Sequence, residues 1–210
     1  MALFDSAADG PDFSLERRYG EGRPVCGVDE AGRGPLAGPV VAAAVLLDPA
    51  RIPPGLNDSK KLLPATRERL YALILDMASV SVAAAPPALI DALNIRGATL
   101  WAMARAVEGL APVAAIALID GRDVPPGLCC PGVAVVRGDG RSFSIAAASI
   151  VAKVVRDRMC AVLHAAYPAY GIARHKGYPT AVHLAALARS GATEHHRVSF
   201  APVARLVTGG

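Results

Sequence analysis

The order of short apolar runs along the chain limits the folds that it can adopt. Two runs of strand length come first, and later runs of strand length alternate with amphipathic stretches of helical periodicity. This order is typical of an α/β domain, so we predict a mixed central β-sheet flanked by helices, with a helical C-terminal portion. The predicted strands cover residues 25–29, 40–47, 79–85, 113–119 and 133–136, and the predicted helices begin near Pro64 and cover residues 94–110, 144–164 and 180–189.

The chain of 210 residues has the length of one ordinary domain. Its first part is polar and rich in glycine, so residues 1–22 are expected to form a loose leader. Residues 23–210 are expected to form a single domain, and its last part, residues 165–210, is expected to be the helical C-terminal portion. We expect the protein to act as a monomer.

Composition excludes some classes of protein. An apolar content of 53% is too high for a disordered chain. The longest apolar stretch, residues 35–47, is shorter than the roughly 20 residues that cross a bilayer, and the first residues lack the basic segment of a secretory signal. The four cysteines lack the spacing of a zinc site. We therefore expect reduced thiols, a cytoplasmic protein and no membrane partner. A net charge of +4 is compatible with nucleic-acid binding but does not establish it.

Acidic residues stand where three predicted strands end. Asp29 and Glu30 precede Gly32, Asp120 precedes Gly121, and Asp139 lies between two glycines. An Asp before Gly is often only a turn former. Open α/β sheets, however, place ligands at the carboxyl ends of their strands, so neighbouring strands would bring four carboxylates together. Such a cluster needs cations, and oxygen ligands favour Mg²⁺ or Mn²⁺ over zinc or copper.

The adjacent acids Asp29 and Glu30 raise a geometric question. Neighbouring side chains on a regular strand point to opposite faces of the sheet, so both cannot face one site from an ideal strand. We therefore expect the strand either to end before Glu30 or to contain a bulge there, with Gly32 and Gly34 allowing an irregular exit.

Seven blocks of the sequence together resemble the ribonuclease HII family, in order and spacing, over residues 25–203. One departure is small: Arg137 stands where the family often has Lys, which keeps the charge. The blocks are residues 27–40 (GVDEAGRGPLAGPV), 57–62 (NDSKKL), 119–121 (IDG), 138–140 (GDG), 144–153 (SIAAASIVAK), 175–180 (HKGYPT) and 195–200 (HHRVSF).

The resemblance implies a ribonuclease-H-like fold and a metal-dependent endonuclease. The expected substrates are RNA–DNA hybrids and duplex DNA that contains ribonucleotides. The expected mechanism uses two Mn²⁺ or Mg²⁺ ions and leaves 5′-phosphate and 3′-hydroxyl ends, and the expected role is ribonucleotide excision repair. The implied metal ligands are Asp29, Glu30 and Asp120, with Asp139 as the fourth acidic residue. Asp157 competes for that fourth position, but a solvent-exposed salt bridge within a helix explains it adequately, so we assign the position to Asp139.

The resemblance also implies how the substrate is recognised. The family uses the Gly32-Arg33-Gly34 turn to detect the ribose 2′-hydroxyl, which distinguishes RNA from DNA. Tyr178 is expected to pack at the nucleotide after the ribonucleotide. Lys60 and Lys176 are candidates for phosphate contacts, which position a nucleic acid without reading its sequence.

Two other classes of function remain open at this point. A resolvase-like or integrase-like nuclease would share the fold and the metal ions, but it gives no reason for the Gly-Arg-Gly turn or for the Lys-Gly-Tyr-Pro loop. A non-catalytic nucleic-acid-binding module would need no acidic cluster, since carboxylates near phosphates weaken binding.

Overall fold

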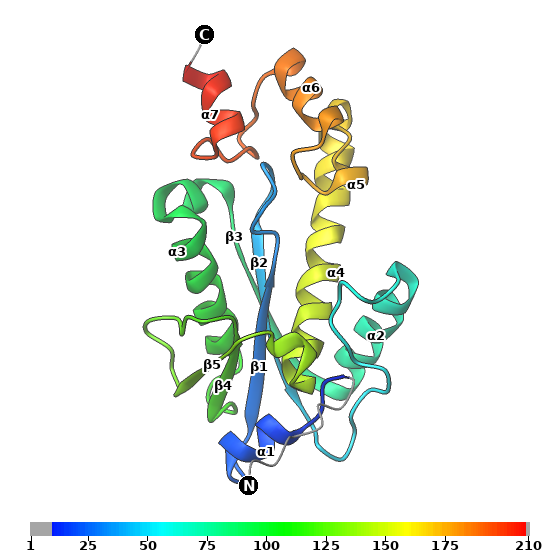
Figure 1. The fold of residues 1–210 in the computed structure, drawn as a ribbon, viewed down its shortest axis with the longest axis vertical. Coiled ribbons are helices and arrows are strands. Elements are labelled where there is room, and N and C mark those ends of the chain that lie inside the picture. The colour runs from blue at the N-terminus through cyan, green and yellow to red at the C-terminus, as the bar shows by residue number, and fades with distance from the viewer. Residues whose placement is uncertain (1–9, 209–210) are drawn as a thin grey trace, which may run out of the picture.

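A five-stranded mixed sheet occupies the centre of the computed structural model, which describes residues 10–208 (Figure 1). The strand order is β3-β2-β1-β4-β5; β1 pairs with β2 antiparallel and with β4 parallel. The predicted mixed sheet flanked by helices is confirmed. The strands are β1 (Val25–Ala31), β2 (Val40–Leu47), β3 (Ala78–Ala85), β4 (Ile116–Asp120) and β5 (Gly132–Val135). The α-helices are α1 (Ser14–Gly20), α2 (Pro64–Met77), α3 (Pro87–Glu108), α4 (Phe143–Ala166), α5 (Ile172–His175), α6 (Ala181–Ser190) and α7 (Ala201–Thr208), with short 3-10 turns η1 (Gly138–Gly140) and η2 (Pro168–Tyr170).

Small and β-branched residues allow helices to pack on both faces of the sheet. Helix α3 covers one face, and α4 with α2 covers the other (Figure 1). The inner strand β2, next to the central strand β1, alternates its buried side chains between two hydrophobic clusters, one against α3 and one against α4. Burial of an apolar side chain is worth roughly 1.5–3 kcal/mol, so these two layers supply much of the stability of the fold.

Gly27 brings α4 into direct contact with β1. A Cβ atom at this position would lie 2.1 Å from the carbonyl carbon of Ser144 and 2.2 Å from the backbone nitrogen of Ile145. The first turn of α4 therefore rests on the backbone of β1, two residues before Asp29. This close approach places α4 beside the acidic end of β1.

The N-terminal segment differs from the expectation of a loose leader over residues 1–22. Its described part contains α1, in which Leu15 is buried against Val25 and Ile145. The buried carboxylate of Glu16 accepts hydrogen bonds from the Ser142 hydroxyl at 2.6 Å and from the Ser144 N–H at 2.8 Å. The expectation is therefore wrong for this part, because Glu16 binds orphan donors at the start of α4. Residues 1–9 lie outside the described residues.

Helix α3 begins at Pro87, earlier than the predicted start at residue 94, and it has a kink at Asn94. Asn94 has φ 56° and ψ 170°, which is not helical. Its Oδ1 atom accepts hydrogen bonds from the N–H groups of Arg96 at 2.9 Å and Gly97 at 3.1 Å. Asn94 therefore caps the second part of the helix, where the sequence predicted a beginning, while the first turns from Pro87 were missed.

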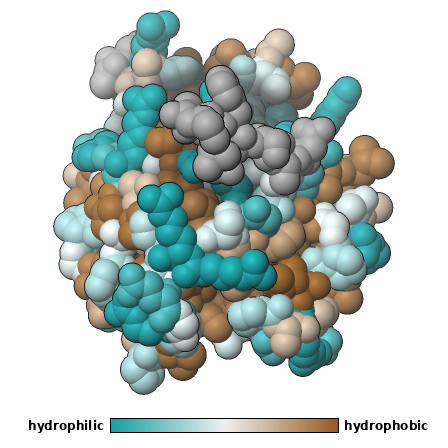
Figure 2. Space-filling model, turned by 60° about the horizontal axis from the view of Figure 1, so that its bottom comes forward, coloured by the Kyte–Doolittle hydropathy of each residue, from teal (hydrophilic) through white to brown (hydrophobic). Residues whose placement is uncertain are grey.

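The C-terminal helices α5, α6 and α7 lie together at the end of the molecule opposite α1 (Figure 1). Viewed from the α1 end, the surface carries hydrophilic side chains spread among hydrophobic ones (Figure 2). In the part of the chain that the structure describes, every helix is too short or too polar to cross a membrane.

Candidate active site

Three acidic side chains converge where β1 passes the end of β4. Carboxylate oxygens of Asp29, Glu30 and Asp120 all lie within 4.8 Å of one another. Val28 of β1 stands opposite Ile119 of β4 in the parallel pair, so the next residues, Asp29 and Asp120, emerge side by side. The sequence-based prediction that strand ends gather these acids agrees with this arrangement.

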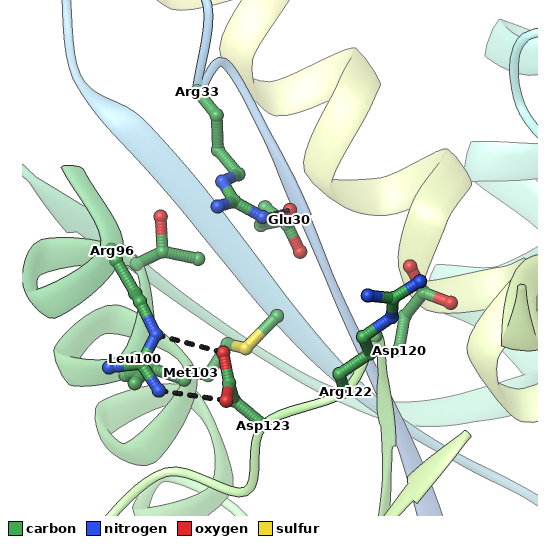
Figure 3. A pocket seen from close by; sticks show the side chains of 10 residues that line it. Glu30, Arg33, Arg96, Leu100, Met103, Asp120, Arg122 and Asp123 are labelled. Carbon is green, nitrogen blue, oxygen red and sulfur yellow. Dashed lines mark hydrogen bonds and ion pairs between the residues drawn. The ribbon is translucent and has the colours of Figure 1, made fainter. Parts of the chain in front are cut away.

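Glu30 joins the cluster without the strand end or bulge that we expected. Strand β1 pairs regularly with β2 as far as Ala31, with Glu30 opposite Ala42, so that expectation is wrong. Strand β4 ends at Asp120, and β1 continues beyond this point without a paired strand on its β4 side. The longer Glu30 side chain can therefore reach the end of β4, and it borders the same pocket as Asp120 (Figure 3).

Backbone donors and a serine hold these carboxylates in place. The Glu30 N–H donates to Asp29 Oδ1 at 2.7 Å, and the Gly138 N–H donates to Asp120 Oδ1 at 2.7 Å. The nearby Ser149 hydroxyl of α4 also favours the charged form of the Asp29 carboxyl group. The site is thus preorganised by the turn after β5 and by α4.

Negative charge accumulates in the cluster beyond what these donors offset. Burial, followed by the charges of Glu30 and Asp120, raises the pKa of Asp29 well above its ordinary value. Burial also raises the pKa of Asp120, although the Gly138 N–H acts in the opposite direction. Three oxygen donors that repel one another suit a hard divalent cation, so the residues fit Mg²⁺ or Mn²⁺.

Asp139 lies beside the three acids and outside their tight group. It sits in η1 directly after Gly138, and its Oδ2 atom is 3.9 Å from Lys60 Nζ. Burial and then repulsion by the charge of Asp120 raise the pKa of Asp139. The rival Asp157 instead forms an ion pair with Lys153 at 2.7 Å within α4, as the interpretation of a helix salt bridge expected.

A groove of about 300 Å³ opens next to the acidic cluster. It brings together the predicted substrate-binding residues Gly32, Arg33, Gly34, Lys60 and Tyr178, whereas Lys176 is not among the residues that line it. A Cβ atom on Gly34 would lie 3.3 Å from the Tyr178 ring, so the turn and the tyrosine are neighbours.

Three residues of this groove were missed by reasoning from the sequence. The hydroxyls of Ser59 and Ser149 lie 2.8 Å apart and are buried, although their segments are 90 residues apart. Arg156 lines the groove with a buried side chain that donates to the carbonyl oxygens of Pro39, Ala37 and Lys176. A serine in a polar turn, a serine in an apolar helix and an arginine in a charged helical stretch carry no local signal of such roles.

Glu30 and Arg33 also line a smaller pocket of about 40 Å³ (Figure 3). The Arg33 side chain extends toward Glu30, with Nη1 3.4 Å from Oε1. Across the pocket, Arg96 binds Asp123 through two hydrogen bonds of 2.9 and 2.7 Å. Arginines therefore flank the acidic cluster, which favours an anionic substrate.

Comparison with known proteins agrees with this geometry. A model of the ribonuclease HII family matches residues 26–203. Ribonuclease HII of Rhizobium johnstonii is 58% identical over 210 residues, covering 99% of this chain and 91% of that protein. Ribonuclease HII of Xanthobacter autotrophicus is 61% identical over 196 residues, covering 92% of this chain and 78% of that protein.

Solved structures show the same fold. Ribonuclease H2 from Pyrococcus horikoshii superposes with a TM-score of 0.74 at 27% identity, covering 89% of this chain and 98% of that one. RNase HII from Archaeoglobus fulgidus, solved in complex with PCNA, gives a TM-score of 0.72 at 30% identity, covering 84% and 95%. The alternatives of a resolvase-like nuclease and of a non-catalytic module are therefore set aside. The chain belongs to the ribonuclease HII family and is an endoribonuclease.

Proposed function

We propose that this enzyme cuts the RNA strand of RNA–DNA hybrids and also cuts at single ribonucleotides embedded in duplex DNA. The product ends would be a 5′-phosphate and a 3′-hydroxyl, and the second activity would serve ribonucleotide excision repair. The observation that carries the proposal is the acidic cluster beside a groove lined by both the Gly32-Arg33-Gly34 turn and Tyr178. A nuclease that ignored the sugar would need the acids but not this groove.

Asp29, Glu30 and Asp120 would hold the metal ions, with Asp139 completing the set. Two bound Mg²⁺ or Mn²⁺ ions would supply Lewis-acid stabilisation of the phosphate and a more acidic water. The protein's own contribution is positional, because the Gly138 N–H orients Asp120 while Ser149 supports Asp29. Lys60, at the rim of the groove, offers an exposed ammonium group to a phosphate oxygen.

The turn and Tyr178 would recognise the substrate. Gly34 has no side chain of its own to screen its N–H group, so it allows the close approach that a 2′-hydroxyl contact requires, whereas the space beside Gly32 is taken by the Arg156 side chain. The adjacent Tyr178 ring would stack on the next sugar or base. Lys176 contributes its carbonyl oxygen to Arg156, so any phosphate contact by its ammonium group would lie outside the groove.

The enzyme would act as a monomer in the cytoplasm. Its four cysteines are free, which agrees with a reducing compartment. Burial raises the pKa of Cys26 to about 12, so this thiol stays protonated and unreactive.

Replacing Tyr178 with Ala tests the recognition part of the proposal. The ring is 47% exposed, so its removal should leave the melting temperature almost unchanged. Loss of one stacking contact is worth about 1–3 kcal/mol, or roughly ten- to hundredfold in kcat/KM. The loss should be larger on a single embedded ribonucleotide than on a continuous hybrid, which offers many alternative registers.

Two matched variants complete this comparison. Tyr178→Phe keeps the ring and should retain most of the activity on both substrates. Tyr71→Ala removes a tyrosine that packs under Arg158 and does not line the groove, so it should not change the ratio between substrates. Equal losses on both substrates, together with a lower melting temperature, would remove Tyr178 from the recognition site.

Asp139 and Asp157 can be compared directly as candidates for the fourth acidic role. We expect Asp139→Asn to reduce turnover by about a hundredfold or more at saturating Mg²⁺, because its carboxylate interacts with Asp120. Asp157→Asn removes only an ion pair with Lys153 and should cost less than about tenfold. Steady-state kinetics on an RNA–DNA hybrid would decide, and a larger loss for the helix variant would reverse the assignment.

A further inference from the structure

Arg197 places a buried guanidinium group directly behind the Gly32-Arg33-Gly34 turn. The residue is 0% exposed, and it donates only to backbone carbonyl oxygens. Its Nη2 donates to Gly32 at 2.7 Å and to Gly38 at 2.9 Å, Nη1 donates to Arg33 at 2.9 Å, and Nε donates to Gly38 at 3.0 Å. Among the described residues no carboxylate forms a salt bridge with it.

A buried charge without an acidic partner is costly, so its hydrogen bonds must be well made. Burial lowers the pKa of Arg197 to about 9. The Phe200 ring covers the guanidinium at 5.1 Å from its centroid. The planar guanidinium spreads its donors over three nitrogens in a fixed geometry, whereas a lysine offers its three donors from a single nitrogen and cannot cover the same set of carbonyl positions.

Because the peptide bond is planar, fixing the carbonyl groups of the turn also fixes the direction of its N–H groups. In a trans peptide the C=O and the following N–H point in opposite directions. Since the Gly32 and Arg33 carbonyls point toward Arg197, the N–H groups of Arg33 and Gly34 point away from it. Neither N–H has a hydrogen-bond partner within residues 10–208, and both residues are exposed in the groove wall.

We propose that Arg197 is a positioning residue, which aims the N–H groups of Arg33 and Gly34 at the oxygen of a substrate sugar hydroxyl. This role rests on the proposed function, in which the turn reads the ribose. In addition, discrimination between ribose and deoxyribose would depend on Arg197, which lies 165 positions after Gly32 in the sequence. Arg197 touches no substrate; it acts by orienting peptide groups.

The other buried arginine, Arg156, does not share this role. Arg156 binds the carbonyl oxygens of Pro39, Ala37 and Lys176, so it holds the surrounding loops and leaves the Gly32 and Arg33 carbonyls to Arg197. The two peptide groups that would present donors are therefore oriented by one guanidinium group.

The test is a comparison of binding in an Asp120→Asn background, which prevents cleavage. Two duplexes of one sequence are used, one all DNA and one with a single ribonucleotide, and their dissociation constants are measured by fluorescence anisotropy. The parent should prefer the ribonucleotide duplex. Arg197→Lys should reduce that preference about tenfold, the effect of one or two lost hydrogen bonds, and should leave affinity for the all-DNA duplex within about twofold.

A matched control separates positioning from simple loss of stability. Val203→Ala removes a buried side chain of α7, in the same part of the molecule, without touching the turn. It should lower the melting temperature and retain the full preference. Full preference in Arg197→Lys would overturn the role of Arg197 alone. A parent that shows no preference would overturn the proposed reading of the ribose, and the role of Arg197 with it.

A second measurement does not depend on the folding of the Arg197 variant. In the ¹⁵N-labelled Asp120→Asn protein, the amide proton resonances of Arg33 and Gly34 should move downfield on binding the ribonucleotide duplex. The all-DNA duplex should produce a clearly smaller shift. Equal shifts with the two duplexes would show that these N–H groups do not bind the hydroxyl, and would overturn the proposal.

Discussion

Replacing Asp120 with Asn is expected to reduce hydrolysis of an RNA–DNA hybrid by at least about a thousandfold. The substitution removes a charged carboxylate oxygen, a proposed metal ligand, from the acidic cluster, and metal-ion stabilisation of the transition state is worth several kcal/mol. The amide of the new side chain can still accept the hydrogen bond from the Gly138 N–H, so the local structure should survive. Single-turnover kinetics with Mg²⁺ and with Mn²⁺ would measure the loss.

The same substitution should stabilise the protein when metal ions are removed. Burial and mutual repulsion raise the pKa values of Asp29 and Asp120, so the folded state binds protons more readily than the unfolded chain does. The metal-free protein should therefore gain stability as the pH falls from neutral through the raised values toward the ordinary Asp value of 3.8. Asp120→Asn should gain less over the same range, because one titrating carboxyl group is gone.

Thermal unfolding in a chelating buffer at several pH values would check this dependence. Asp76→Asn is a suitable control, since Asp76 is 77% exposed on α2 and far from the acidic cluster in the sequence. It should leave both turnover and the pH dependence as in the unchanged protein. Near-normal turnover in Asp120→Asn would refute the assignment of Asp120 as a metal ligand.

Gly27→Ala is expected to lower the free energy of unfolding by about 3 kcal/mol or more, the upper end of the usual cost of overpacking. The added methyl group would meet backbone atoms of Ser144 and Ile145 at 2.1 and 2.2 Å, and backbone cannot move aside as a side chain can. Helix α4 would have to shift away from β1. Since α4 carries Ser149 to Asp29, activity should fall as well.

Urea denaturation would measure this change in stability. Gly10→Ala provides a control, because a Cβ atom there would have no neighbour within 4 Å. The control should change the free energy of unfolding by less than about 0.5 kcal/mol, as surface substitutions usually do. A Gly27→Ala protein as stable as the control would show that α4 does not rest on the backbone of β1.

Local patterns were sufficient to predict the sheet and most of the site. Short β-leaning or apolar runs bounded by turn residues, together with the alternation in residues 79–85, predicted all five strands within a few residues, because such patterns indicate buried or half-buried strands. The Asp120-Gly121 step was visible because strand ends need turn residues. The family blocks placed Gly32, Gly34 and Tyr178 in one site, and the structure brings them to one groove.

Contacts between distant segments were decided only by the tertiary structure. Glu30 reaches the cluster because β4 ends at Asp120 while β1 continues, a difference that no pattern within β1 records. Glu16 reaches the start of α4 across 128 residues, and Arg197 reaches Gly32 across 165. Side-chain hydrogen bonds of this kind depend on which surfaces come together when the elements pack. The type of a residue alone does not predict its distant partner.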